Sequence, residues 1–152
     1  MADAYADSSF PNGSFGFRRR LIVDHEPLRK SYLTFKVSGV QGRVASAMLR
    51  VYVPTQPSYS GSVDGGAVAT LHDTRWSEAT VTFRQRPRIN RRILAALGAV
   101  RPGHWYAFEV TDAVTGNGTV SLGLTSSSMD AVYYASRQDK AFAPQLIVTL
   151  TS

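Results

Sequence analysis

Two groups of cationic residues are the parts of this chain whose types and spacing could do chemistry. The first group lies on two expected strands that are neighbours in the sequence, and its cations are Arg18, Arg19, Arg20, Arg29, Lys30 and Lys36, with Tyr32 between the two lysines. Alternate residues of a strand share one face, so Arg20, Lys30, Tyr32 and Lys36 are expected to point outward. Guanidinium groups bind carboxylate, sulfate and phosphate oxygens in pairs. The first group therefore predicts a surface for a polyanionic partner.

The second group lies in one short arginine-rich segment, whose cations are Arg84, Arg86, Arg88, Arg91 and Arg92. Alternation at 84, 86 and 88 would place three guanidinium groups on one side of an extended chain. This group is interpreted either as a second anion site or as charge that protects an edge strand from aggregation. The surrounding segment, 84–103, is predicted as a short helix or an irregular strand, because Ile89, Ile93 and Leu97 recur at helical spacing.

Aromatic residues add candidates for contact with a ligand. Tyr133 and Arg137 share the outward parity of an expected strand at 131–137 and would border the first group if that strand is its neighbour. Trp76 and Trp105 are interpreted as core or loop residues rather than as sugar platforms.

The composition limits the chemistry that the chain can perform. There is no cysteine, which excludes a disulfide framework and a thiolate metal site. The histidines, His25, His72 and His104, lie in different expected elements, and no nucleophile elbow, phosphate loop or HExxH helix is present. The chain is predicted not to be an enzyme. No cofactor is predicted, although Asp3, Asp7 and Asp112 are hard oxygen ligands that could join a structural calcium site.

The charge balance favours an anionic partner that is neither a membrane nor a nucleic acid. The 152 residues include 17 basic and 11 acidic ones, for a net charge of +6. Arginine outnumbers lysine 14 to 3. No apolar run is long enough for a transmembrane helix, so no membrane partner is predicted. No nucleic-acid-binding motif is present, so no nucleic-acid partner is predicted, with nonspecific phosphate binding kept as an alternative.

Period-two alternation dominates the chain and predicts an all-β fold. The clearest pair spans 29–53, with Leu33, Phe35 and Val37 inward on its first strand. Further strands are expected at 3–7, 18–24, 67–72, 79–83, 104–110, 119–125, 131–137 and 145–151, with one helical turn at 111–115. Nine or ten short strands separated by turns predict a two-sheet antiparallel β-sandwich. The length predicts a single module over 1–152.

The order of these segments resembles a known family. The segments are DAYAD, LIVD, RKSYLTFKVSGV, ASAMLRVYV, DTRWSEATVTF, WYAFEVTDAV, GTVSLGLTS and SRQDKAFAPQLIVT. Together they resemble the DNRLRE domain, which overlaps carbohydrate-binding module family 96. The resemblance implies a jelly-roll β-sandwich appended to alginate lyases and related secreted enzymes, and for some members it implies binding to acidic polysaccharide. Two departures make this chain more basic: Gln138 replaces an acidic residue, and the 84–87 segment replaces an Asn-rich one.

Residues and resemblance together predict a non-catalytic carbohydrate-binding module. It would hold an attached enzyme or a surface on an acidic polysaccharide, with alginate as the first candidate. The predicted contacts are Arg20, Lys30, Tyr32 and Lys36, followed by Arg18, Arg29, Tyr133 and Arg137. The chain is expected to be secreted, monomeric and attached to a larger secreted enzyme. The alternatives are a structural or adhesion spacer without a sugar ligand, a nonspecific nucleic-acid binder, and a small lyase.

Overall fold

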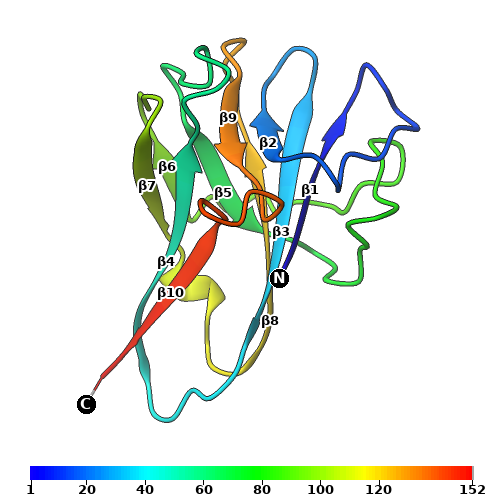
Figure 1. Ribbon diagram of the computed structural model, residues 1–152. Coiled ribbons are helices and arrows are strands. Elements are labelled where there is room, and N and C mark those ends of the chain that lie inside the picture. The colour runs from blue at the N-terminus through cyan, green and yellow to red at the C-terminus, as the bar shows by residue number, and fades with distance from the viewer. Residues whose placement is uncertain (152) are drawn as a thin grey trace.

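The structure is a computed structural model that describes residues 1–151, and it is built almost entirely of strands (Figure 1). The strands are β1 (Ala2–Asp7), β2 (Arg20–Val23), β3 (Arg29–Val37), β4 (Val44–Val53), β5 (Gly66–Thr70), β6 (Ala95–Leu97), β7 (His104–Glu109), β8 (Gly118–Thr125), β9 (Val132–Ala135) and β10 (Gln145–Leu150). A single 3-10 turn, η1 (Thr111–Ala113), follows β7 where the sequence predicts one helical turn. No helix within residues 1–151 is long and apolar enough to cross a membrane.

The strands form antiparallel sheets that pack together, which confirms the predicted β-sandwich. One sheet has the order β1-β3-β8-β5-β6, and the second has the order β10-β4-β7. A third, two-stranded sheet pairs β2 with β9. Consequently β2 does not pair with β3, although a bridge between Asp24 and Arg29 brings the end of β2 next to the start of β3.

The main core lies between the sheets and follows the alternation of the strands. Leu33 and Leu122 face it from the five-stranded sheet, and Leu49, Val51 and Phe108 face it from the three-stranded sheet. These side chains are at most 1 % exposed. Truncating one of them, for example Leu49→Ala, should therefore cost roughly 2–5 kcal/mol of stability.

A second apolar cluster lies on the outer face of the five-stranded sheet, where the sequence predicts solvent. Its buried members are Ala4, Ala6, Tyr32, Leu71 and Val81, and Trp76, Phe83 and Ile89 pack against them. Gly123 makes room for this cover, because a Cβ there would lie 2.6 Å from Ile89 Cγ1. We call this group the outer cluster; it attaches the 72–94 segment to the sheet.

Two predicted elements differ in the structure. The strand expected at 79–83 is absent: the backbone turns at Ser77, and Val81 and Phe83 pack into the outer cluster. Val81 and Phe83 alternate as in a strand, but they belong to a loop that packs both side chains against the sheet. The N–H groups of Thr80 and Val81 donate to the carbonyl of Ser77 in a turn. In the 84–103 segment the structure contains β6, the irregular-strand alternative, and no α-helix.

Candidate functional site

An open cleft lies where β2 and the segment before it approach the ends of β1 and β3. Its volume is about 380 Å³, and it is lined by Tyr5, Asp7, Phe10, Phe15, Arg18, Arg20, Ile22, Arg29 and Tyr133. We call it the aromatic–arginine cleft. The cleft brings together four residues that the sequence nominates, namely Arg18, Arg20, Arg29 and Tyr133.

Strand parity explains why these side chains meet. Leu21 and Val23 face the main core, so Arg20 and Ile22 face the other side of β2. The partner strand β9 places Tyr133 directly opposite Ile22, next to Arg20. Tyr133 therefore borders the first cationic group, as the sequence predicts for neighbouring strands, because β9 pairs with β2. On the other wall, β1 and β3 place Asp7 opposite Arg29.

Aromatic rings support the cations of this cleft. The rings of Tyr5 and Phe15 stack with centroids 4.8 Å apart. The guanidinium of Arg18 lies 5.7 Å from the Phe15 centroid, and that of Arg20 lies 5.2 Å from the Tyr133 centroid. Cation–π contacts of this kind contribute about 0.5–1 kcal/mol at exposed sites and so help to hold the guanidinium groups in the cleft.

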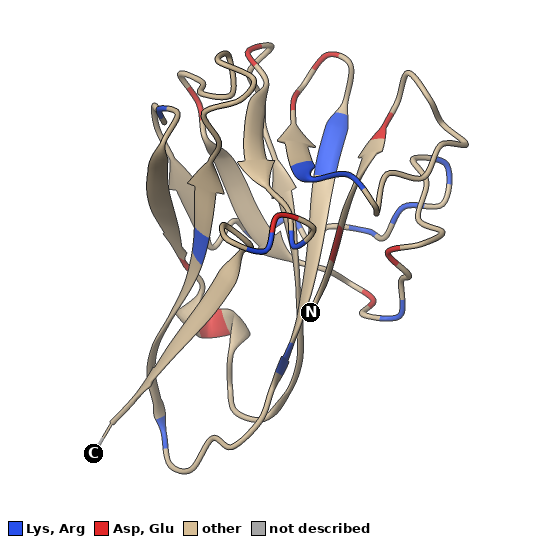
Figure 2. Cartoon of the chain, in the orientation of Figure 1, with Lys and Arg blue, Asp and Glu red and all other residues tan. Residues whose placement is uncertain are grey.

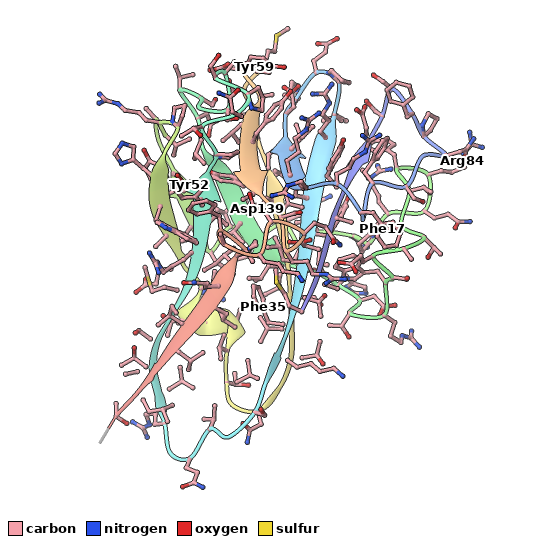
Figure 3. The ribbon with its side chains drawn as sticks, in the orientation of Figure 1. Phe17, Phe35, Tyr52, Tyr59, Arg84 and Asp139 are labelled. Carbon is pink, nitrogen blue, oxygen red and sulfur yellow. The ribbon has the colours of Figure 1, made fainter. Side chains whose placement is uncertain are left out.

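The sequence interpretation missed most of these rings. Phe10 and Phe15 lie in the 8–16 segment, whose proline, asparagine and glycines are typical of turns, and Tyr5 lies in the strand expected at 3–7. Tyr59, which Figure 3 labels, is 69 % exposed, and its ring meets that of Tyr133 edge to face with centroids 5.7 Å apart. The one indication of these rings in the sequence is the pair Phe10 and Phe15, two aromatic residues within an otherwise polar turn.

Three guanidinium groups act on one buried hydroxyl in the cleft. Burial raises the pKa of Tyr5, while the charges of Arg18, Arg20 and Arg29 act in the opposite direction. Only the carboxylate of Asp7 adds to the upward shift. The electrostatic potential around Tyr5 is therefore dominated by cations.

The arginines of the cleft differ in their partners. Arg29 Nε lies 3.0 Å from Asp7 Oδ2 and Arg29 Nη1 lies 3.8 Å from Asp24 Oδ2, and both carboxylates are 5 % exposed. No ion pair in the described residues involves Arg18 or Arg20. Arg20 Nε is also buried without a hydrogen-bond partner there, which is an unfavourable state for a charged donor. Arg29 thus stabilises the wall, and Arg18 and Arg20 are the cations available to a ligand.

Tyr32 does not belong to any exposed surface, so its predicted outward exposure is wrong. Its side chain is buried in the outer cluster, with its ring centroid 6.0 Å from that of Trp76. Burial raises the pKa of Tyr32, and its hydroxyl has no hydrogen-bond partner within residues 1–151. The parity prediction for Tyr32 was correct, but the outer face at this position is covered by the 72–94 segment.

The predicted lysines of β3 do not form one face with Arg20. Lys36 is exposed near the other end of the strand, beside Phe35 and Val37. Lys30 lies instead in a separate cleft with arginines of the second group. The row expected along β3 is interrupted because Tyr32, between the two lysines, is covered.

Arg137 forms a structural ion pair outside the aromatic–arginine cleft. Its Nε donates to Glu78 Oε1 at 2.6 Å, and its Nη2 donates to Glu78 Oε2. Its backbone N–H donates to Asp3 Oδ2 at 2.8 Å. Although burial opposes the shift, the hydrogen bonds from Arg137 and from the Asp3 backbone lower the pKa of Glu78. The arrangement joins the 72–83 loop to β1 and to the segment after β9.

Asp3 is the most strongly perturbed carboxyl of this arrangement. It is 0 % exposed, and its Oδ1 has no hydrogen-bond partner in the described chain. Burial raises its pKa to about 7, against the opposing hydrogen bond from Arg137.

The sequence of this chain matches one known family over almost its whole length. Residues 1–150 match the model of carbohydrate-binding module family 96. The chain belongs to this family. The match confirms the resemblance read from the ordered segments, and it implies a polysaccharide partner and a type of module that is typically non-catalytic. No curated protein matches the chain.

The module contains a second positively charged cleft on the other face of β3. Its volume is about 270 Å³, and it is lined by Lys30, Arg84, Arg86, Pro87, Arg88 and Ile89. We call it the basic cleft. Figure 2 shows blue segments at the start of β3, before β2 and along the loop beyond β1. Arg84, Arg86 and Arg88 line the same cleft, so they lie on one side of the chain as the sequence predicts, although the segment is a loop.

The aspartates proposed as calcium ligands do not come together. Asp3 accepts from Arg137, Asp7 pairs with Arg29, and Asp112 Oδ2 accepts from Arg92 Nη2 at 2.9 Å. Among residues 1–151 there is no group of three or more His, Cys, Asp or Glu side chains that could hold a metal ion.

Proposed function

We propose that the module binds an acidic polysaccharide in the aromatic–arginine cleft, with alginate as the first candidate. The observation that carries this proposal is the convergence of Arg18, Arg20 and Arg29 on Tyr5 in an open cleft, where Arg18 and Arg20 form no ion pair within residues 1–151. The ligand would be held by charge and ring contacts, with no bond made or broken.

The charges suit a polymer that carries a carboxylate on each sugar. Arg18 is exposed and Arg20 is half-buried, so a uronate carboxylate could accept hydrogen bonds from either guanidinium. Each exposed ion pair is weak in water, at about 0.2–1 kcal/mol, so several must form together. The affinity should therefore rise with the number of uronate units and fall with salt concentration.

The rings suit the apolar faces of a sugar. Tyr133 and Phe10 line the cleft, Phe10 is 60 % exposed, and the exposed Tyr59 meets Tyr133 edge to face. These rings lose little conformational entropy on binding because packing already orders them. A polyanion without pyranose rings would use the arginines but not these surfaces.

The biological setting is proposed from the family. A non-catalytic module of this kind would hold an attached enzyme, or a surface, on its polysaccharide outside the cell. The rival role is a spacer or adhesion module without a sugar ligand, and it predicts no binding at all.

The test is a titration of the protein with alginate, hyaluronate, a neutral glucan and duplex DNA at two salt concentrations. The Arg18→Gln/Arg20→Gln variant should bind alginate about threefold to thirtyfold more weakly, since each lost ion pair contributes up to about 1 kcal/mol. The control is Arg43→Gln/Arg101→Gln, which removes the same charge from exposed residues outside both clefts.

Three outcomes would contradict the proposal. Absence of binding to every acidic polymer would favour the spacer role. Equal loss in both double variants would mean that net charge, and not this cleft, determines binding. Duplex DNA bound as tightly as alginate at the higher salt concentration would make the sugar preference a general electrostatic effect.

A further inference from the structure

The basic cleft concentrates positive charge without any acidic partner. Four cations, Lys30, Arg84, Arg86 and Arg88, line a space of about 270 Å³. No ion pair in residues 1–151 includes any of them. The other cleft differs, because there Asp7 and Asp24 pair with Arg29.

Lys30 lies beside a like charge within the basic cleft, which places it together with Arg84, Arg86 and Arg88. Burial, and next the charge of Arg86, lower the pKa of Lys30. No carboxylate opposes this shift. Like charges held together are unfavourable, so an anion bound between them would relieve the repulsion.

The loop that carries these arginines is held in place at several points. The Arg84 N–H donates to the carbonyl of Pro11 at 3.0 Å, and the His72 N–H donates to the carbonyl of Arg88 at 2.8 Å. Arg86 Nη1 donates to the Phe83 carbonyl at 2.7 Å while its guanidinium lies 3.9 Å from the Phe83 centroid. The cationic groups are thus brought together before any ligand binds.

The two clefts are separated by little more than one strand. Arg29 and Lys30 are adjacent in β3, so their side chains point to opposite faces and into different clefts. Beyond β3 at this edge lie β1, the last strand of the sheet, and the 8–16 segment, which lines the first cleft with Phe10 and Phe15 and accepts the Arg84 N–H at Pro11. In Figure 3 Arg84 lies on the side of the molecule beyond β1, as does the exposed Phe17 of the segment that precedes β2.

We propose that the basic cleft binds further carboxylate groups of the same polysaccharide chain, which crosses the edge strand β1 from the aromatic–arginine cleft. The inference rests on the proposed function and adds a second subsite to it. Lys30, Arg84 and Arg88 contact the polymer there, and Arg86 closes one wall.

The test compares short alginate oligosaccharides with alginate polymer by isothermal titration at low and moderate salt. Arg84 and Arg88 are exposed and their side chains form no hydrogen bond or ion pair within residues 1–151, so Arg84→Gln/Arg88→Gln should fold normally. This variant should bind polymer roughly threefold to tenfold more weakly, as two exposed ion pairs predict, and should show a shallower salt dependence. Short oligosaccharides should bind it as they bind the wild type.

The matched control is Arg43→Gln/Arg91→Gln, which removes two exposed arginines outside the cleft. Equal polymer affinity in the two double variants would overturn the second subsite and leave the proposed function standing. An equally large loss for the shortest oligosaccharide would overturn the division into two subsites. If wild-type protein binds no acidic polymer, both the proposed function and this inference fail.

Discussion

The aromatic–arginine cleft and the basic cleft both present arginines, yet the folded chain treats the two sets of charge differently. In the first, Arg29 is held between Asp7 and Asp24, and rings orient Arg18 and Arg20. In the second, four cations share a cleft that no carboxylate of residues 1–151 lines. The comparison indicates that the first set partly serves the fold, whereas the second forms no ion pair within residues 1–151.

The largest effect should follow from removing Arg29. Arg29→Met would leave the nearly buried carboxylates of Asp7 and Asp24 without their cation, and breaking such a pair costs about 3–5 kcal/mol. Denaturant unfolding at neutral pH measures this loss. Arg88→Met is the control in the basic cleft and should leave stability unchanged or slightly raised. Equal destabilisation by both variants would remove the distinction between the clefts.

The next effect concerns Asp3, which lies on the same strand as Tyr5 and Asp7. Its pKa of about 7 in the folded protein exceeds the ordinary value of 3.8, so the folded state binds the proton more tightly. Stability from this group is therefore complete below about pH 4 and is lost as the pH rises towards 7. The shift corresponds to at most about 4 kcal/mol.

Asp3→Asn should remove that pH dependence. The amide can still accept from the Arg137 N–H, and nothing in the described chain hydrogen-bonds the second oxygen of Asp3. We expect the variant to unfold at higher denaturant concentration than the wild type at pH 8, with a smaller difference at pH 5. Glu78 acts in the opposite sense at lower pH, because its lowered pKa removes stability only as the pH falls below its usual range. Parallel stability curves for the two proteins from pH 5 to 8 would contradict the prediction.

A smaller effect should separate ring contacts from charge contacts. Tyr133→Leu removes the ring beneath Arg20 and beside Tyr59. Affinity for short alginate oligosaccharides should fall about threefold to fivefold, as the loss of about 1 kcal/mol of cation–π and stacking energy predicts. The slope of affinity against salt concentration should stay unchanged, because no charge is lost. A shallower slope would mean that Tyr133 acts only by positioning Arg20.

The smallest effect is expected at Lys36. Lys36→Ala should leave alginate affinity and stability unchanged, because this lysine is exposed near the far end of β3 from both clefts. Lys30→Ala, on the same strand, should weaken polymer binding about twofold to threefold. Titration of the two variants in parallel tests whether β3 carries one continuous row of cations, as its sequence suggests, or whether only its first end contacts the ligand.

Much of the fold was predictable because alternation reports directly on burial. Leu33, Leu49, Leu122 and Leu124 occupy the core face that their parity predicts. The same reasoning failed at 79–83, where Val81 and Phe83 insert from a loop. Parity identifies which side chains share a side of the chain, but it does not identify what lies against that side.

The candidate site was predictable only in part, for the same reason. Parity predicts the outward position of Arg20 and Tyr133, and residue type alone indicates Arg18 and Arg29. Pairing of β2 with β9 then brings Tyr133 beside Arg20, in the cleft that Arg18 and Arg29 also line. The rings of Tyr5, Phe10 and Phe15 were missed, because their proximity arises from the return of the 8–16 segment over β1.

The amino-acid sequence by itself determined the class of fold, the family and the excess of arginine, since these depend on composition, local periodicity and the order of segments. Only the tertiary structure decided which cations are free to bind. Arg137 is bound to Glu78, Arg29 to Asp7 and Arg92 to Asp112, all through contacts between residues distant in the chain. It also decided that Tyr32 is buried, because the 72–94 segment gains more by covering an apolar sheet face than by remaining in water.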